Sequence, residues 1–354
     1  MRTYVLASLT FQLAALGSGL AQDGTDPALD QPSVSEPSKG MPVDDFGFWL
    51  GTWDVQNFRR DRTTGEWSAD GQAEAAITQA FGGRLVVEQW NGTSGAFENT
   101  FGISLRYFDE SLKRWVVLLS WPSGNPVTAG FSQMQGVFED GMCTLYPPSL
   151  FTGKGAELSG RATRFVFSDA AEDSCLWTMQ IPSAEDRWTS VWQMQFQRTG
   201  MPESETHKPF EVEFPPQTCA CSQSEARALD RLVGEWTGED GFSVRVTSVN
   251  RGCGVFVALE SPGFGEFFGC VLHNLASGAT MSRFVHNEAT LSLESWGAEL
   301  NQESSELVLS GGEHKFLFET NEEGVLRVRQ TEGSGDSAEF VLERVRNQPD
   351  KSGG

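Results

Sequence analysis

The sequence carries one series of landmarks twice, and this internal repeat limits the possible folds more than any other feature of the chain. Each copy opens with Gly-x-Trp, continues with a glycine turn before an apolar strand and with a Phe before Phe-Gly, and ends in an apolar strand closed by an arginine. Chance easily supplies one such match, but not four in the same order, so the sequence predicts two domains of one fold. The landmarks are Leu50–Trp53, Gly82–Glu88, Phe97–Gly102 and Phe196–Arg198 in the first copy, and Val233–Trp236, Gly252–Glu260, Phe264–Gly269 and Phe340–Arg344 in the second.

Apolar and polar residues alternate along both copies, as half-buried β-strands require. Turn residues recur between the strands, and the best helical segments, Asp45–Leu50 and Glu225–Val233, are short. Many short strands with regular turns are typical of a β-sandwich or a closed up-and-down barrel of about eight strands. Two sets of residues are each expected to lie on one face of their own strand. One set is Trp188, Ser190, Trp192, Met194 and Phe196, and the other is Trp115, Val117, Leu119 and Trp121.

Composition along the chain marks the domain boundaries. Two stretches are rich in Pro, Ser, Asp and Glu and hold too little apolar surface to offset the entropy of ordering them. We interpret the first as a disordered leader and the second as the linker between the domains. The predicted parts are a signal peptide (1–21), the leader (22–43), a first barrel (44–198), the linker (199–222), a second and smaller barrel (223–346) and a disordered tail (347–354).

The N-terminus predicts an exported protein. A single charge at Arg2 precedes an apolar run over Tyr4–Leu16, and small residues occupy the cleavage-site positions up to Ala21. No cysteine follows the run, so a lipid anchor is not expected. After cleavage near Ala21 the protein is expected to be secreted or periplasmic.

Charge and hydropathy exclude several classes of partner. The formal net charge of −22 would repel phosphate backbones and anionic lipid headgroups. No segment after the signal approaches the roughly 18 apolar residues that a membrane span needs. We therefore expect neither nucleic acid nor a membrane as a partner.

The first copy carries the motifs Gly51-x-Trp53-Asp54, Gly82-Gly83, Glu88-x-Trp90, Tyr107-Phe108-Asp109 and Trp115. These motifs resemble those of secreted bacterial domains of unknown function in the lipocalin-like, or calycin, group. The resemblance covers 45–198 well and 225–346 weakly, and it implies two tandem antiparallel lipocalin-like β-barrels in an all-β fold. The second copy, at Gly234–Asp240, also resembles the opening of nitrobindin-like haem barrels.

The resemblance also implies how each barrel is closed. In calycins the tryptophan of Gly-x-Trp plugs one end, and an arginine of the last strand lies over it. Here the corresponding pairs are Trp53 with Arg198 and Trp236 with Arg344. A guanidinium over an indole contributes roughly 0.5–2 kcal/mol, so we interpret these residues as structural.

The candidate ligand site lies in the first barrel, which holds most of the tryptophans. Glu88 shares a strand face with Trp90, and an inward face would place a carboxylate among aromatic rings. Such a carboxylate is expected either to pair with an arginine, Arg106 or Arg164, or to have a raised pKa. Glu260 has the same relation to Phe256 in the second copy. Rigid aromatic walls suit a small, largely apolar ligand, although such residues also fill cores. The candidate ligand-binding residues are Glu88, Trp90, Tyr107, Trp115 and Trp192.

The cysteines are disulfide candidates, because an exported chain favours bridges over metal sites. Bridges from the linker to the second barrel would staple the smaller domain, and a four-sulfur zinc site is the weaker alternative. Cys143 and Cys175 are expected on two strands that flank a common neighbour. Two strand spacings come to about 9.5 Å, beyond the ~7 Å between Cα atoms that a disulfide allows, so their bridge stays an open question. We expect no metal site and no cofactor. For haem, the candidate axial ligand is His273, and a lone histidine on a strand is usually solvated or hydrogen-bonded. The candidates are Cys143, Cys175, Cys219, Cys221, Cys253 and Cys270.

Three functions stay open for this chain. The first is a non-enzymatic binding module with its ligand in 45–198 and with Glu88 as the polar anchor. The second is a small-barrel enzyme that uses Glu88 as general acid or base. The third is a structural or interaction protein with filled barrels. Hydrolysis is disfavoured, because the first barrel has no histidine for a Ser-His-Asp triad. A cavity of roughly 300 Å³ or more would indicate a ligand site.

Overall fold

The structure is a computed structural model. The predicted signal peptide, leader and tail lie outside the described residues, as does the linker from residue 202 onward. The described residues are 45–98, 100–121, 130–151, 163–183, 188–201, 228–238, 241–249, 254–261, 265–274, 277, 279–287, 291–301, 306–312, 314–321, 325–332 and 337–345.

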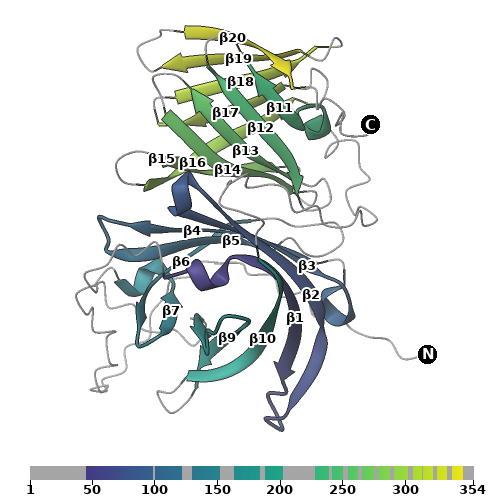
Figure 1. The fold of residues 1–354 in the computed structure, drawn as a ribbon, viewed down its shortest axis with the longest axis vertical. Coiled ribbons are helices and arrows are strands. Elements are labelled where there is room, and N and C mark those ends of the chain that lie inside the picture. Colours follow the sequence, from purple (N-terminus) through teal and green to yellow (C-terminus); the bar gives the residue numbers. More distant parts are fainter. Residues whose placement is uncertain are drawn as a thin grey trace, which may run out of the picture. The chain divides into compact units, whose positions relative to one another are not determined.

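The first domain is a closed antiparallel barrel in which each strand pairs with the next along the chain and β1 pairs with β10 (Figure 1). Closure leaves no unpaired sheet edge. The strands are β1 (Gly51–Arg60), β2 (Trp67–Ala80), β3 (Leu85–Gly92), β4 (Phe101–Asp109), β5 (Arg114–Ser120), β6 (Ser132–Glu139), β7 (Met142–Tyr146), β8 (Arg164–Ser168), β9 (Ser174–Pro182) and β10 (Trp188–Gly200).

The second domain repeats this topology, and β11 pairs with β20. The all-β class and the two tandem antiparallel barrels are thereby confirmed, with ten strands in each rather than about eight. The strands are β11 (Gly234–Thr237), β12 (Ser243–Val249), β13 (Gly254–Ser261), β14 (Gly265–Asn274), β15 (Ala279–Asn287), β16 (Leu291–Asn301), β17 (Glu306–Gly311), β18 (His314–Thr320), β19 (Val325–Glu332) and β20 (Ser337–Arg344).

Helical structure in the described residues is limited to single 3₁₀ turns. Two of them lie within the short segments expected before each Gly-x-Trp. None of the described helices has the length and apolar character of a membrane span. The 3₁₀ turns are Gly47–Trp49, Phe81–Gly83, Gly95–Phe97, Pro148–Phe151 and Ala228–Arg231.

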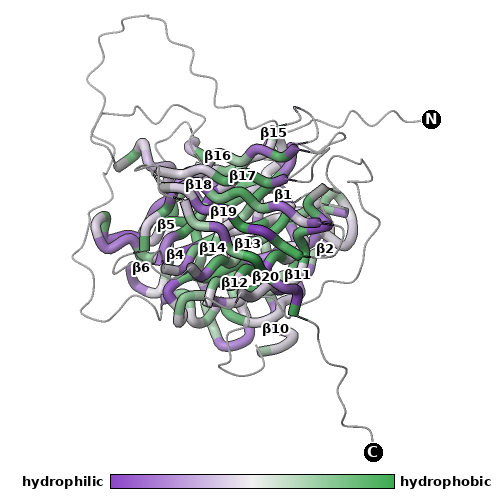
Figure 2. The backbone as a smooth tube through the Cα atoms, turned by 90° about the horizontal axis from the view of Figure 1, so that it is seen from above, coloured by the Kyte–Doolittle hydropathy of each residue, from purple (hydrophilic) through white to green (hydrophobic). Residues whose placement is uncertain are grey.

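Alternation along the strands separates an interior from an outer face, and the hydropathy colouring in Figure 2 changes along the strands accordingly. On β5, Trp115 and Val117 belong to the core of the first barrel, and Trp121 packs against that core. Val116, which alternates with them, belongs to a separate apolar cluster. The shared face expected along Trp115–Trp121 is therefore confirmed.

Strand β10 departs from strict alternation at one point. Its pairing with β9 shifts register between Ser190 and Trp192, so one extra residue is accommodated there as a β-bulge. Trp192 contacts the ring of Trp177 inside the barrel, whereas Trp188 contacts Tyr146 and is half-buried. The prediction that Trp188 and Trp192 share a face was wrong, because a bulge reverses the alternation.

A third apolar cluster joins the outer faces of the two barrels. It includes Leu85 and Val116 of the first barrel and Phe256 and Phe268 of the second, each nearly or fully buried. At its margin, Nη1 of Arg84 donates a hydrogen bond to the Asn287 side-chain oxygen at 2.7 Å. These strands therefore have two apolar faces, as strands buried on both sides do.

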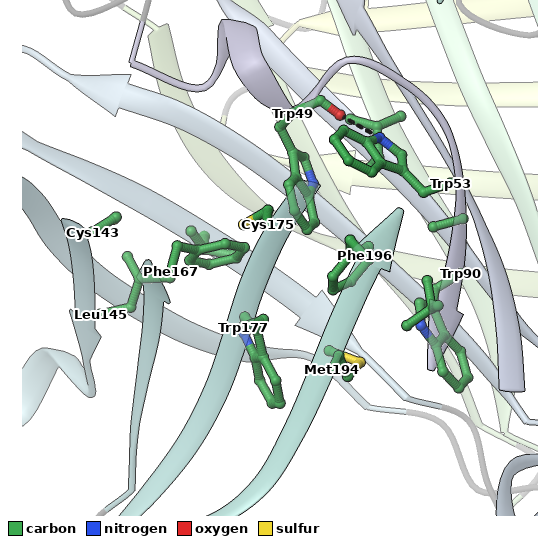
Figure 3. Close-up of a cluster of buried hydrophobic side chains, with 14 of the residues drawn as sticks. Trp49, Trp53, Trp90, Cys143, Leu145, Phe167, Cys175, Trp177, Met194 and Phe196 are labelled. Carbon is green, nitrogen blue, oxygen red and sulfur yellow. Dashed lines mark hydrogen bonds between the residues drawn. The ribbon is translucent and has the colours of Figure 1, made fainter. Parts of the chain in front are cut away.

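One end of the first barrel is closed by stacked aromatic and cationic groups. The Arg198 guanidinium lies 4.1 Å from the Trp53 ring centroid, and Nε1 of Trp53 donates to the Trp49 carbonyl at 2.9 Å (Figure 3). Arg198 also donates to the carbonyls of Phe48 and Leu50. A single side chain thus holds the 3₁₀ segment against the last strand.

The second barrel uses the same arrangement. The Arg344 guanidinium lies 5.0 Å from the Trp236 ring centroid and donates to the Val233 carbonyl. Nε1 of Trp236 donates to the Leu232 carbonyl at 2.9 Å. In both copies the closing arginine is the strand partner of the tryptophan.

Candidate ligand site in the first barrel

The interior of the first barrel contains a cavity of about 30 Å³. Its walls are mostly aromatic and aliphatic, with a few polar groups at one side. A void of this size holds one or two water molecules, far below the roughly 300 Å³ of an ordinary ligand pocket. Its walls include Trp49, Glu88, Trp90, Arg106, Trp121 and Phe196.

Three side chains on neighbouring strands supply the polar side of the cavity. Glu88 of β3 pairs with Ser104 of β4, and Arg106 lies two residues further along β4 on the same face. Oε2 of Glu88 accepts hydrogen bonds from Ser104 Oγ at 2.7 Å and from Arg106 Nη2 at 2.5 Å. The Glu88 and Arg106 side chains are only 9% and 5% exposed. The cavity is thus bounded by a buried ion pair without net formal charge.

Aromatic rings surround the Arg106 guanidinium, with ring centroids 5.4 Å from it for Phe46 and for Phe167, and 5.5 Å for Trp49. Ring faces attract cations, which offsets part of the loss of hydration. Two of the guanidinium nitrogens, Nε and Nη1, are nevertheless buried without a hydrogen-bond partner in the described structure. The site therefore has donor capacity that the described protein groups leave unused.

Two buried thiols lie near this ion pair, on the strands that flank β8. Burial raises the pKa of the Cys175 thiol to about 12, with the positive charge of Arg106 acting in the opposite direction. Burial likewise raises the pKa of the Cys143 thiol. Both side chains are therefore neutral core groups at physiological pH.

Cys143, Cys175 and Cys270 are free cysteines in the described structure. None of these three forms the disulfide for which it was a candidate, and each is buried within an apolar cluster. For Cys143 and Cys175 the intervening strand β8 keeps the thiols apart. Cys219, Cys221 and Cys253 lie outside the described residues. The described part of the chain contains no cluster of His, Cys, Asp and Glu suited to a metal ion.

A group of aromatic rings lies beside the cavity, on the side away from Trp53. Trp121 contacts Trp90 and Trp192, with centroids 4.8 and 5.7 Å apart. Phe97 stacks on Trp192 at 5.0 Å, and the Arg59 guanidinium lies 4.5 Å from the Trp192 ring. Half-buried Trp121 and Arg59 make this the more exposed side of the interior.

The candidate ligand residues occupy different places. Glu88 and Trp90 line the cavity, and Trp192 contacts its wall through Trp121. Trp115 lies toward the plugged end, where its Nε1 donates to the Asp45 carboxylate at 3.0 Å. Tyr107 belongs to the outer apolar cluster and does not face the interior. The structure thus brings three of the five together.

The partner of Glu88 is Arg106, whereas Arg164, the other candidate, bonds the Gln180 side chain at 2.7 Å. Sequence reasoning missed Trp49 and Ser104 as groups near the carboxylate. Ser104 had a detectable signal, because it shares its strand face with Arg106. Trp49 had no such signal, because its segment is not a strand and strand alternation does not apply to it.

Among its described residues, the second barrel has no counterpart of the Glu88 site. Glu260 is exposed, and Phe256, on the same strand face, packs in the outer cluster. The expectation of an inward carboxylate in the second copy was therefore wrong. Of its histidines, His286 stacks on Phe267 at 4.0 Å, and His273 Nδ1 lies 3.1 Å from the Thr280 hydroxyl.

Comparisons with known proteins give only low similarities. No protein-family model matches the chain, and no curated protein matches it. Among solved structures it is similar to a protein of unknown function from the DUF3598 family of Nostoc punctiforme, with 11% identity and a TM-score of 0.26 over 86% of this chain and 100% of that one. It is also similar to Aeromonas veronii immune modulator A, with 8% identity and a TM-score of 0.15 over 84% and 94% of the two chains. At these TM-scores neither likeness carries an argument about this chain.

Proposed function

We propose that this chain is a non-enzymatic, exported binding module of lipocalin-like type, whose first barrel takes up a small, largely apolar ligand. The observation that carries the proposal is the ion pair of Glu88 and Arg106, buried beside a cavity whose other walls are mostly aromatic and aliphatic. Glu88 and Arg106 would hold the polar end of the ligand.

A buried ion pair supports this proposal because it is a poor way to stabilise a core. Well-packed apolar residues of similar volume are often as stable as a buried pair, or more stable by about 1–4 kcal/mol. The Glu88–Arg106 pair borders the cavity and retains buried donors without protein partners. A role in binding accounts for both properties, whereas core filling accounts for neither.

The cavity of about 30 Å³ accepts only a few atoms of such a ligand. The apolar remainder would need space now occupied by Trp121 and Trp192, the rings on the more exposed side of the interior. Side chains at binding surfaces commonly change rotamer on binding. The proposal therefore includes movement of these two rings.

Titration of the full chain with apolar dyes and fatty acids, followed by tryptophan fluorescence, tests the proposal. We expect saturable quenching that Trp192→Ala weakens at least tenfold, or about 1.4 kcal/mol. Trp188→Ala is the matched control, because it also removes one tryptophan but lies beyond the bulge, in the outer group with Tyr146. Absence of saturable quenching, or equal effects of the two variants, would contradict the proposal.

A structural protein with filled barrels is the second candidate, and the small volume of the cavity favours it. In that case the outer faces, not the interiors, would meet partners. Such a protein would show no saturable quenching with any compound of the panel. The same titration therefore separates the two functions.

A further inference from the structure

The buried polar atoms that lack partners inside the first barrel share one property: all of them are donors. They are Trp49 Nε1, Asn57 Nδ2, Trp90 Nε1, and Nε and Nη1 of Arg106, among the described residues. The four side chains belong to residues that are between 0% and 4% exposed. Other unpartnered atoms of this domain, such as those of Asn91, alternate with inward residues and belong to the outer face.

Three of these four donor residues, Trp49, Trp90 and Arg106, line the same cavity. Figure 3 shows Trp49 and Trp90 with Phe196 between them. A buried donor without a partner is unfavourable, so acceptors from water or from a ligand would stabilise this site. The unpartnered buried atoms of the interior thus call for acceptor atoms.

The charge of the site indicates which acceptors fit. Oε2 of Glu88 already balances the Arg106 charge, and both groups are buried. A carboxylate ligand would lose its hydration and lie close to Glu88, and like charges at such range repel. An uncharged carbonyl oxygen avoids both penalties and still accepts from a guanidinium or an indole N–H.

We infer that the ligand of the first barrel presents uncharged acceptor oxygens, as in a ketone, ester or amide, to Arg106, Trp49 and Trp90. This inference rests on the proposed function and specifies the chemical class that the site selects. It distinguishes such ligands both from fatty acids in their ionised form and from hydrocarbons.

Calorimetric titration of the full chain at pH 7.5 with acetophenone, benzoate and ethylbenzene tests the inference, because the three share one ring and differ in the polar group. We expect acetophenone to bind at least about tenfold more tightly than either of the other two compounds. A hydrogen bond to a charged group changes an affinity by about this factor. Equal binding of ethylbenzene would overturn the inference, as would tighter binding of benzoate.

Two variants assign the preference to these donors. Trp90→Phe keeps an aromatic ring but removes one N–H, and we expect it to weaken acetophenone binding several-fold relative to ethylbenzene. The double variant Glu88→Met/Arg106→Met removes the charged pair as a unit, and we expect most of the preference to disappear. A preference unchanged in both variants would overturn the inference, provided that circular dichroism shows both to be folded.

Failure of this inference is distinguishable from failure of the proposed function. If none of the three compounds gives saturable heat, the inference is overturned. The proposed function falls only if the dye and fatty-acid titration also shows no saturable quenching.

Discussion

Arg106 of β4 donates through Nη2 to Oε2 of Glu88 on β3 at 2.5 Å, and both side chains are more than nine-tenths buried. The two residues are not direct strand partners, because Glu88 pairs with Ser104. The guanidinium reaches the carboxylate diagonally, along the inner face of the sheet. The contact therefore joins two neighbouring strands through buried, oppositely charged side chains.

Breaking this pair on one side is expected to destabilise the protein more than removing it. Arg106→Met leaves a buried carboxylate without its cation, and we expect the free energy of unfolding to fall by about 3–5 kcal/mol. Glu88→Met/Arg106→Met is expected to lie within about 1 kcal/mol of the original chain, or above it. Urea denaturation measures both. A double variant less stable than the single one would show that the pair stabilises the fold outright.

Arg198→Ala tests the closure of the first barrel. The variant loses hydrogen bonds to three backbone carbonyls, those of Phe48, Leu50 and Glu172, together with the contact to the Trp53 ring. We expect a loss of about 3–5 kcal/mol in the free energy of unfolding.

The control for this variant is Arg329→Ala. Arg329 pairs with Glu339 at the surface, where its side chain is 54% exposed. An exposed ion pair contributes about 0–1 kcal/mol, so little change is expected. Comparable losses in the two variants, measured by urea denaturation, would refute a closing role for Arg198.

The buried thiols are expected to resist alkylation in the folded protein. Burial raises the pKa of Cys143, Cys175 and Cys270, so the reactive thiolate is scarce and reagents lack access. Treatment with iodoacetamide at pH 8, followed by mass spectrometry of peptides, should find these three positions labelled only after unfolding in urea. Labelling in the native state at any of them would contradict the described core.

Stability is expected to fall as the solution becomes alkaline. A thiol in the unfolded chain ionises near pH 8.5, whereas Cys175 in the folded chain has a pKa raised to about 12. The folded state therefore binds this proton more tightly, and its contribution is complete below about pH 8.5 and is lost as the pH rises toward 12.

Urea denaturation between pH 8 and pH 10.5 measures this loss. Cys175→Ala should lessen the decrease over that interval, whatever its effect at pH 8. The pKa of the buried Tyr107 hydroxyl is also raised, so part of the decrease should remain in the variant. A decrease of the same size in both proteins would exclude Cys175 as a contributor.

Several features of this protein could be predicted from its sequence because they depend on local pattern. The repeated landmarks predict two domains, and both are ten-stranded barrels with the same topology. The period of two predicts that Glu88 and Trp90 share a face, and both line the cavity. The alternation of side chains along a strand is a property of the backbone, so it can be read without knowing what covers each face.

Tertiary structure alone decided which of two apolar faces points inward. Tyr107 and Arg106 are neighbours on β4, yet the charged residue faces the interior and the tyrosine packs in the outer cluster shared with the second barrel. When both faces of a strand are buried, alternation no longer distinguishes core from exterior. The same ambiguity in the second copy led to the wrong expectation for Glu260.

Two further features depend on single insertions and on volumes that no local pattern contains. One extra residue between Ser190 and Trp192 separates Trp188 from the interior, although the surrounding sequence alternates without interruption. The cavity is the small space left after ten strands have placed their side chains, so its size follows from the packing of all of them together. The sequence by itself thus determined the strands, the repeat and Glu88 as the candidate carboxylate. Only the packed barrel decided which residues pair with and surround Glu88, and how large the cavity beside it is.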